Sequence, residues 1–309
     1  LYGSEKKDRS PEERFAYIIE QACIQTGKQV VVLIDEYDKP LLQAILDESL
    51  LDEYRKILKA FYGVLKSADR YLRFVFLTGV TKFAQVSVFS DLNQLNDISM
   101  KSPYAALCGI TREELQQTFL PELERLAKRR GRSLQEVIDL MECQYDGYHF
   151  HPEGAGMFNP FSVLNAFDAE ELGYYWFQTG TPTYLVDLLK KSDYDIRLLI
   201  DGVEVLASAF SEYRAETNNP LPMIYQSGYL TIKEYDKERR QYLLSFPNEE
   251  VRQGFSESLF RYYSPDGMGS YDALCGAYFQ HVKKEGNMSA FLPHLKTFYD
   301  KFPYTLIPH

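Results

Sequence analysis

The sequence lacks the cysteine patterns, long apolar runs and targeting signals that mark several classes of protein. Its four cysteines are far apart and form no C-x-x-C pair, a pattern that favours reduced, mostly buried thiols over a disulfide or zinc framework. No apolar run approaches the ~18 residues of a membrane span. The charged opening LYGSEKKDRSPEE contains no signal-peptide core. We therefore expect a cytoplasmic protein with no membrane partner.

An excess of positive charge is also missing. The chain has 34 Lys and Arg residues against 44 Asp and Glu residues, which gives a formal net charge of −10. This balance argues against broad, non-specific binding to a phosphate backbone. Hydrophobic residues make up 45% and charged residues 25%, which is ordinary for a soluble globular chain. The 309 residues are enough for two or three domains.

A third absence is the glycine-rich loop G-x-x-x-x-G-K-[ST], whose backbone amides and lysine hold the phosphates of a nucleotide. The nearest candidate fails, because Gly27-Lys28 is followed by Gln29 and Ala22 stands where the first glycine is required. These 309 residues therefore contain no complete phosphate-gripping loop of this type.

The beginning of the sequence shows a helix–strand–helix–strand rhythm. Ser10-Pro11-Glu12-Glu13 predicts a helix start with a capping box, and Gly27 predicts its end. The apolar run Val30–Ile34 does not alternate, which predicts a strand buried on both faces. A second amphipathic helix follows at 51–65, and RFVFLTG (73–79) predicts a second buried strand. This order is typical of an α/β fold with a parallel sheet and right-handed crossovers.

The remainder of the sequence is mostly helical in pattern. Residues 83–110 are loop-rich, with a short edge strand expected near YAALCGI. Helices expected at 111–130, 133–144, 161–171 and 183–191 form what we interpret as a helical lid. A helix at 203–213, a hairpin of Tyr229–Lys233 with Gln241–Ser245, and a helix capped by Asn248 indicate a winged-helix domain. The expected division is a sheet domain at 1–110, a lid at 111–202, a winged helix at 203–262 and a linker with a further helix at 263–309.

The first predicted strand delivers two carboxylates at its end, and these are the strongest candidates for chemistry. In nucleoside triphosphatases an apolar strand that ends in acidic residues, the Walker B motif, holds magnesium. On this interpretation Asp35 binds Mg²⁺, mainly through water, and Glu36 polarises the attacking water as general base. Thr78, with Thr81 and Lys82, is placed to sense the γ-phosphate, since ligands of open α/β sheets bind at this edge. The competing interpretation is that Asp35 merely ends a strand and starts a turn.

A string of segments extends this interpretation over the chain from about residue 10 to 309. In order they are VVVLIDEYDKPLL, LRFVFLTGVTKFAQVSVFSDLNQLNDIS, YDGYHF, NPFSVLNAF, YWFQTGTPTYLV, QSGYLTI and FPNEEVRQGF. Together they resemble the bacterial AAA-ATPase-like family, whose members are predicted ATP-binding proteins close to STAND and archaeal-type ATPases. The resemblance implies an ATP-driven regulatory switch that uses ATP and Mg²⁺ in the full-length protein. It carries the Walker B roles over to Asp35 and Glu36, and a sensor role to Thr78.

The resemblance also implies two elements that the sequence does not contain: a Walker A segment upstream and a PD-(D/E)XK nuclease-like domain downstream. The only D/E-x-K triplet is Glu5-Lys6-Lys7, which lies in a charged loop, so the nuclease centre is missing. The sequence, which has no initiator Met, is expected to be either a C-terminal piece of an ATPase or a degenerate relative. We expect strand 73–78 to expose an unpaired backbone edge, which is an aggregation hazard. The 309-residue chain alone is expected to bind ATP weakly or not at all.

Two weaker candidates are a histidine pair and a basic cluster. His149 and His151 could ligate a metal, but packing or surface roles are commoner for such histidines. The basic side chains that lie close together between residues 125 and 132 are more simply a solvated helix face than a phosphate site. They are Arg125, Lys128, Arg129, Arg130 and Arg132.

The sequence supports two hypotheses of function. The first is an NTPase module in which ATP moves the lid and the winged helix. The second is a nucleic-acid-associated or protein-docking module with a non-hydrolysing scaffold sheet. Residues 220–262 carry six basic and six acidic side chains, whereas a groove-binding face usually has excess positive charge. A protein partner, or self-association through the winged helix, is therefore favoured over DNA.

Overall fold

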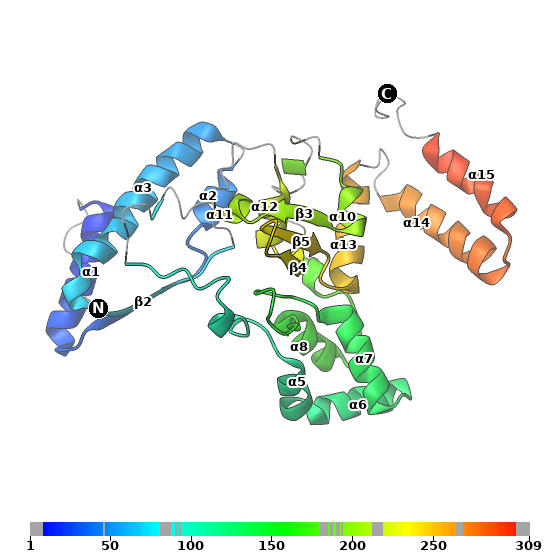
Figure 1. The fold of residues 1–309 in the computed structure, drawn as a ribbon, viewed down its shortest axis with the longest axis horizontal. Helices are drawn as coiled ribbons and strands as arrows, with labels where there is room; N and C mark the ends of the chain where they lie inside the picture. Colours follow the sequence, from blue (N-terminus) through cyan, green and yellow to red (C-terminus); the bar gives the residue numbers. More distant parts are fainter. Residues whose placement is uncertain are drawn as a thin grey trace.

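The computed structural model describes residues 9–45, 47–80, 88, 89, 92, 94–179, 185, 188, 189, 192, 194–211, 219–263 and 268–300. Figure 1 shows an N-terminal α/β unit on the left, a helical region at the bottom and an antiparallel sheet with its helices in the centre. A helical hairpin close to the C-terminus extends on the right (Figure 1).

The N-terminal unit has the predicted helix–strand–helix–strand order, with one additional short helix after the first strand. Helix α1 (Pro11–Thr26) starts at the Ser10–Glu13 capping box and ends at Gly27, and β1 (Val30–Ile34) follows. The chain continues through α2 (Lys39–Gln43), α3 (Glu48–Ser67), the 3₁₀ turn η1 (Asp69–Tyr71) and β2 (Leu72–Leu77). Strands β1 and β2 are parallel, as predicted, with Ile34 opposite Leu77.

Helices α1 and α3 pack together beside this strand pair. The rings of Phe15 and Phe61 stack between them at 4.5 Å. Ile19 from α1, Val32 from β1 and Leu65 from α3 belong to one buried hydrophobic cluster. The amphipathic pattern of both helices thus supplies the apolar layer that holds the strands.

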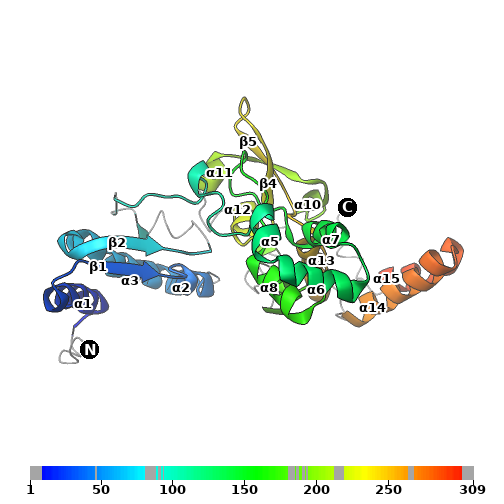
Figure 2. The ribbon, with the colours of Figure 1, turned by 90° about the horizontal axis from the view of Figure 1, so that it is seen from below.

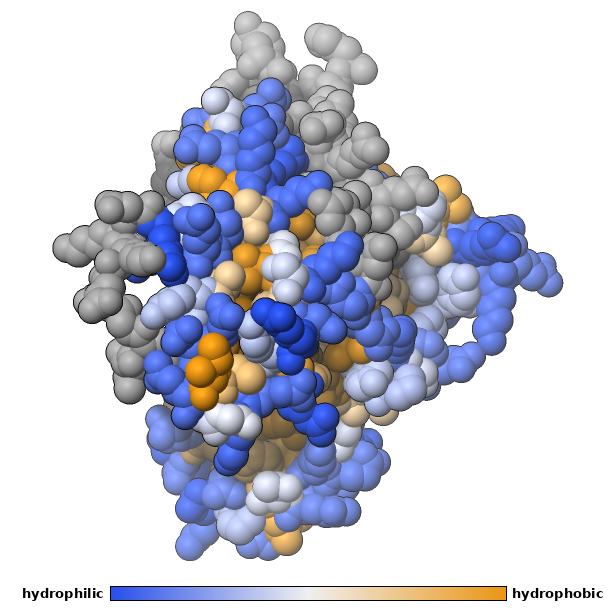
Figure 3. All heavy atoms as spheres, turned by 90° about the vertical axis from the view of Figure 1, so that its left-hand side faces the viewer, coloured by the Kyte–Doolittle hydropathy of each residue, from blue (hydrophilic) through white to orange (hydrophobic). Residues whose placement is uncertain are grey.

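The prediction that β1 is buried on both faces is wrong. Val32 is 8% exposed, but Val31 and Leu33, whose side chains point to the opposite face, are 52% and 69% exposed. Phe74 of β2 is likewise 54% exposed. A non-alternating apolar run is buried on both faces only where layers pack on both sides of the sheet. The N-terminal side of the molecule accordingly shows exposed hydrophobic residues among hydrophilic ones (Figure 3).

In the segment that connects the α/β unit to the helical region, residues Ser102–Tyr104 form the 3₁₀ turn η2. The prediction of an edge strand near YAALCGI is wrong. These residues form turns, and among them only Ile110 makes a β-bridge, which is isolated and antiparallel, with Phe158.

Residues 111–169 form the predicted helical region, with one difference. The helices are α5 (Arg112–Thr118), α6 (Leu120–Arg130), α7 (Leu134–Tyr145) and α8 (Pro160–Ala169). The single helix expected at 111–130 is divided at Phe119, because Pro121 occupies the first turn of α6, where its missing N–H is tolerated. These helices share a hydrophobic core that includes Leu123, Met141 and Phe158. Most of the helix expected at 183–191 lies outside the described residues.

The central region contains a three-stranded antiparallel sheet in the order β3-β5-β4. Around it lie η3 (Trp176–Thr179), α10 (Leu198–Asp201), α11 (Ser208–Ser211), α12 (Leu221–Gln226) and α13 (Glu249–Tyr263). The predicted hairpin is present as β4 (Thr231–Asp236) and β5 (Gln241–Ser245). The prediction of a helix at 203–213 is wrong for its first residues, because these form the strand β3 (Val203–Leu206).

The wrong prediction of a helix where β3 forms has a clear physical origin. Val203 and Val205 alternate with the exposed Glu204 and Leu206, which is the period-two pattern of a strand with one buried face. Val203 pairs with Leu244 and continues the sheet beside β5. Long-range pairing decided the conformation of this short segment, whose local pattern was ambiguous.

The described chain ends in a helical hairpin. Its parts are α14 (Met268–Ala277), the π-helical segment η4 (Tyr278–Lys284) and α15 (Met288–Tyr299). Among the described residues, no helix combines the length and the apolar character needed to cross a membrane.

Candidate functional site at the ends of the parallel strands

The strand ends bring Asp35 and Thr78 together. Because β1 and β2 are parallel and in register, their carboxyl ends lie at the same edge of the sheet. The Thr78 amide donates to the Ile34 carbonyl at 2.8 Å, which extends the ladder by one residue. Beyond it, the Thr78 hydroxyl donates a hydrogen bond to Asp35 Oδ1. Two predicted site residues that are 43 positions apart in sequence are therefore direct neighbours.

Glu36 lies beside this pair but its side chain is engaged elsewhere. Its backbone is in the left-handed region, with φ 51°, which is uncommon for a residue with a long side chain. Its amide donates to Asp35 Oδ1 at 3.0 Å. Its carboxylate pairs with Lys39 Nζ at 2.6 Å, and both side chains are exposed. The hydrogen bond from Lys39 to Glu36 and the charge of Glu36 raise the pKa of Lys39.

Asp38 is a buried carboxylate that sequence reasoning missed. Its Oδ1 accepts a hydrogen bond from the Val80 amide at 3.1 Å, while its backbone carbonyl accepts from Leu41 and Leu42 at the start of α2. Asp38 thus joins the segment after β1 to the segment after β2. The signal was its place immediately before Lys39-Pro40, which is typical of a residue that begins a helix.

Tyr37 and Gly79 complete the contact between the two strand ends. The Tyr37 amide donates to the Thr78 carbonyl at 2.9 Å, and its buried ring lies 4.9 Å from that of Phe89. Burial is the main cause that raises the pKa of the Tyr37 hydroxyl, so this group stays neutral. A Cβ at position 79 would lie 2.5 Å from the Tyr37 ring and 2.6 Å from Asp38 Oδ1. Glycine at this position therefore allows the close approach of the two loops.

The site residues differ in how far the structure describes them. Asp35 and Thr78 meet at the sheet edge, and Glu36 is adjacent but turned to Lys39. The predicted positions of Thr81 and Lys82 lie outside the described residues. No group of three or more His, Cys, Asp or Glu side chains within the described ranges could hold a metal ion.

The groups present fit magnesium bound together with a phosphate ligand. Asp35 offers a carboxylate and Thr78 a hydroxyl, and both are the hard oxygen donors that Mg²⁺ prefers. Magnesium in nucleotide sites usually keeps several waters and uses one or two carboxylates together with substrate phosphates. A single carboxylate at the sheet edge is therefore compatible with such a site.

The two histidines have local structural partners. His149 Nδ1 lies 3.0 Å from the Gly147 carbonyl, and the His149 amide donates to Thr231 Oγ1 at 2.7 Å. His151 Nδ1 accepts from the Glu153 amide at 3.1 Å. These contacts favour the packing and surface interpretation over a metal site.

The basic cluster is a helix surface with ion pairs. Arg125 pairs with Glu122 at 3.0 Å, and Arg129 pairs with Glu170 at 3.1 Å. Lys128 and Arg129 lie in the last turn of α6, where positive charge is favourable to the helix dipole. The structure therefore supports the interpretation as a solvated helix face.

A second buried carboxylate, Glu250, lies at the start of α13. It accepts hydrogen bonds from Ser162 Oγ at 2.7 Å, the Tyr175 amide at 2.6 Å and the Trp176 amide at 3.0 Å. Burial raises its pKa, and these hydrogen bonds oppose that shift. Glu250 therefore joins α8, the aromatic segment at the start of η3 and α13. It lies in FPNEEVRQGF, one of the segments that carry the family resemblance, but the sequence analysis assigned it no role.

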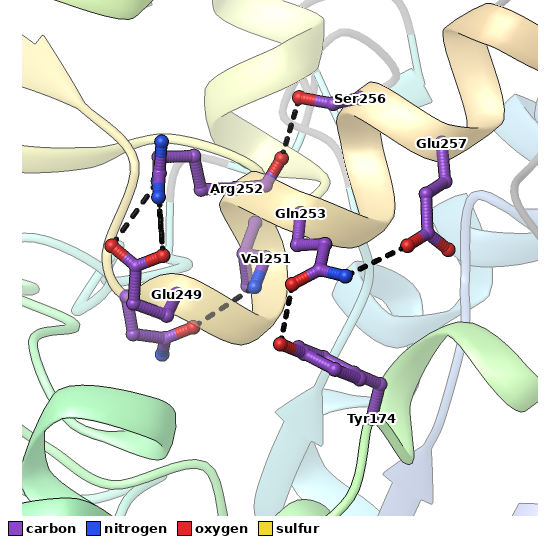
Figure 4. Close-up of polar contacts among 8 residues, drawn as sticks. Tyr174, Glu249, Val251, Arg252, Gln253, Ser256 and Glu257 are labelled. Atoms are coloured by element: carbon purple, nitrogen blue, oxygen red, sulfur yellow. Dashed lines mark hydrogen bonds and ion pairs between the residues drawn. The ribbon is translucent and has the colours of Figure 1, made fainter. Parts of the chain in front are cut away.

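The exposed side of α13 carries a separate polar network (Figure 4). Arg252 contacts Glu249 through both Nε and a terminal nitrogen, with distances of 3.1 and 2.5 Å. Gln253 Nε2 donates to Glu257 at 2.9 Å, and the Tyr174 hydroxyl donates to Gln253 Oε1. All these contacts are exposed, so they fix the surface of α13 rather than form a pocket.

Comparison with known proteins identifies relatives of part of the chain. Residues 1–89 match the model of a family described as "Predicted AAA-ATPase". The chain is 38% identical over 262 residues to a protein of Azotobacter chroococcum mcd 1 named "Uncharacterized protein in vnfD 5'region". That match covers 84% of this chain and 48% of the relative, so the chain spans about half of the relative's length. No solved structure matches.

Proposed function

We propose that this chain carries the magnesium-handling and water-handling edge of an ATPase core. The observation that carries the proposal is the meeting of Asp35 and Thr78 at the carboxyl ends of two parallel strands. The family match over residues 1–89, which contain all of these residues, supports nucleotide binding. ATP with Mg²⁺ is accordingly the proposed ligand of the full-length protein.

Each site residue has a proposed role. Bound magnesium would neutralise phosphate charge, and Asp35 would hold its water ligands. Thr78 keeps the Asp35 carboxylate oriented through its hydroxyl, and its proposed role is to sense the γ-phosphate. Thr81 and Lys82 are proposed as further groups that sense this phosphate.

Glu36 is the proposed general base, which accepts a proton from the attacking water. To do so its carboxylate must leave Lys39. The two side chains are exposed, and ion pairs between exposed groups are weak, so this release is easy.

The test is ATP hydrolysis by the full-length protein carrying Glu36→Gln. Loss of a general base typically lowers the rate about 10²- to 10⁴-fold, while the amide leaves nucleotide binding intact. Glu53→Gln is the matched control, because Glu53 is an exposed residue of α3. Hydrolysis that is the same in Glu36→Gln and wild type would remove Glu36 from the mechanism.

A second candidate function is a protein-docking switch whose sheet is a non-hydrolysing scaffold. The contact between Glu36 and Lys39 at 2.6 Å favours it, because this contact occupies the proposed base. Absence of ATP hydrolysis in both the wild type and Lys39→Met, with nucleotide still bound, would support this candidate over the first.

A further inference from the structure

The turn between β4 and β5 borders a hollow far along the chain from the strand-end site. The hollow has a volume of about 420 Å³ and is lined by Leu206, Ala207, Ser208, Arg239 and Arg240. The β4–β5 hairpin projects from the body of the molecule (Figure 2), so a ligand can reach its turn from solvent.

The backbone around the hollow is held in place by hydrogen bonds. Asp236 Oδ1 accepts from the amides of Glu238 at 2.8 Å and Arg239 at 2.9 Å, which fixes the turn. The Ala207 amide donates to the Arg240 carbonyl at 2.9 Å, which continues the pairing of β3 with β5. These bonds fix the backbone that carries the two arginines, so a ligand would not have to order the turn itself.

Arg240 occupies a backbone position that normally favours glycine. Its φ of 53° lies in the left-handed region, where glycine and asparagine are preferred in hairpin turns. A long side chain at such a position is uncommon, and among the described non-glycine residues only Glu36 and Glu170 share it. Within the part of the chain that the structure describes, no carboxylate forms an ion pair with Arg240.

The guanidinium group of Arg239 can also donate hydrogen bonds to a ligand. Its Nε lies 3.8 Å from Asp236 Oδ2, which is beyond hydrogen-bond distance. Leu206, which is 54% exposed, lines the same hollow and supplies apolar surface to it. The hollow thus combines two adjacent cations with a hydrophobic surface.

We propose that this hollow binds a phosphate monoester on a small apolar body. Guanidinium groups match phosphate oxygens in bidentate geometry. Two of them balance the charge of about −1.5 to −2 on a phosphate monoester at neutral pH. The apolar body packs on Leu206. An extended polyanion fits less well, because Glu204 on the Leu206 side of β3 and Glu238 in the turn are both exposed.

The test is calorimetric titration of the full-length protein with phenyl phosphate, benzyl alcohol and inorganic phosphate as probes. Phenyl phosphate is expected to bind more tightly than either of the others. Arg240→Gly should weaken this binding about tenfold or more, since a charge-assisted hydrogen bond is lost. Glycine suits the left-handed backbone, so this variant is expected to fold as well as the wild type. Lys237→Gln is the control, because Lys237 belongs to the same turn but pairs with Glu153 outside the hollow.

Three outcomes would overturn the proposal. The first is equal affinity of wild type and Arg240→Gly for phenyl phosphate. The second is benzyl alcohol binding as tightly as phenyl phosphate. The third is salt-dependent binding of a short single-stranded oligonucleotide that Arg240→Gly weakens, with no binding of phenyl phosphate, which would identify a nucleic-acid contact instead.

Discussion

At the residue scale, the two strand ends approach each other so closely that one position accepts only glycine. The Tyr37 ring and the Asp38 carboxylate both lie against Gly79. The next residue, Val80, donates a hydrogen bond from its amide to the Asp38 carboxylate. These contacts set the geometry in which the Thr78 hydroxyl reaches Asp35. The strand-end site thus depends on packing by residues that do no chemistry themselves.

Gly79→Ala is expected to destabilise the protein by about 1–3 kcal/mol, because the added methyl group overlaps Tyr37 and Asp38. The matched control is Gly63→Ala in α3, where an added Cβ meets nothing within 4 Å. The control should stabilise by about 0.5–1 kcal/mol, since alanine favours a helix interior. Urea unfolding of both variants measures the difference. A Gly79→Ala protein as stable as the wild type would show that the strand ends are not in close contact.

At the element scale, the β1–β2 pair has one face packed by helices and one face exposed. Of the apolar run in β1, Val31 and Leu33 lie on the exposed face, as does Phe74 of β2. Among the described strands, β2 pairs only with β1. A hydrophobic face next to an open strand edge favours self-association.

The double variant Val31→Lys with Leu33→Lys should therefore reduce concentration-dependent self-association of the 309-residue chain. Because both side chains are more than half exposed, the free energy of unfolding should change by only about 0.5 kcal/mol. Light scattering over a range of protein concentrations measures the first effect, and urea unfolding measures the second.

Leu164→Lys serves as the control, since Leu164 is 50% exposed on α8, away from the sheet. Self-association that this control reduces as strongly as the double variant would assign it to general surface hydrophobicity. A large loss of stability in the double variant would show that the sheet face is buried.

The individual helices and strands show which features of the fold could be predicted from the sequence. The capping box at Ser10 marked its helix start correctly, because this signal is local. The parallel strands and the β4–β5 hairpin were also predicted. Strand β3 was missed, because four residues carry too little periodicity to separate strand from helix. The exposure of Leu33 was missed, because an apolar run does not reveal which layers pack on it.

Some residues of the strand-end site could be predicted from the sequence, and others could not. Asp35 and Thr78 were placed at one sheet edge by strand order alone, and they lie there. The engagement of Glu36 by Lys39 and the burial of Asp38 depend on the turn after β1, whose left-handed Glu36 has no sequence signal. Glu250 depends on three segments that meet only in the folded chain.

At the scale of the whole molecule, Glu250 connects two hydrophobic cores. Through Ser162 it contacts α8 of the helical region, and through the Trp176 amide it fixes an aromatic segment. The Trp176 ring lies 5.0 Å from Tyr229, whose own ring is 5.2 Å from Phe255 of α13. This buried acid therefore couples the helical region to the antiparallel sheet.

Glu250→Ala should destabilise the protein by about 3 kcal/mol or more, because two buried donors and one partly buried donor lose their acceptor. Glu250→Gln should cost much less, since its amide oxygen can still accept from the backbone. Thermal and urea unfolding compare the two variants. Equal stability of Glu250→Ala and Glu250→Gln would contradict the role of the carboxyl as acceptor.

The pH dependence of stability gives a second readout of Glu250. Burial raises the pKa of this carboxyl in the folded state, so the folded protein binds its proton more tightly than the unfolded chain does. Its contribution to stability is therefore present below the unfolded pKa of about 4.3 and is lost as the pH rises through the folded pKa. The difference in unfolding free energy between wild type and Glu250→Gln should accordingly move in favour of the Gln variant as the pH rises. A difference that is independent of pH would show that the folded-state pKa is not raised.

The most direct measurement for the strand-end site is the binding of Mn²⁺ with ATP to the full-length protein, followed by electron paramagnetic resonance. Mn²⁺ takes the same oxygen ligands as Mg²⁺. If Asp35 orients the water ligands of the metal, Asp35→Asn should weaken Mn²⁺–ATP binding about 10- to 100-fold. Asp52→Asn, which alters an exposed acid of α3 paired with Arg55, should leave it unchanged. Mn²⁺–ATP binding by Asp35→Asn that equals the wild type would contradict the proposed metal site.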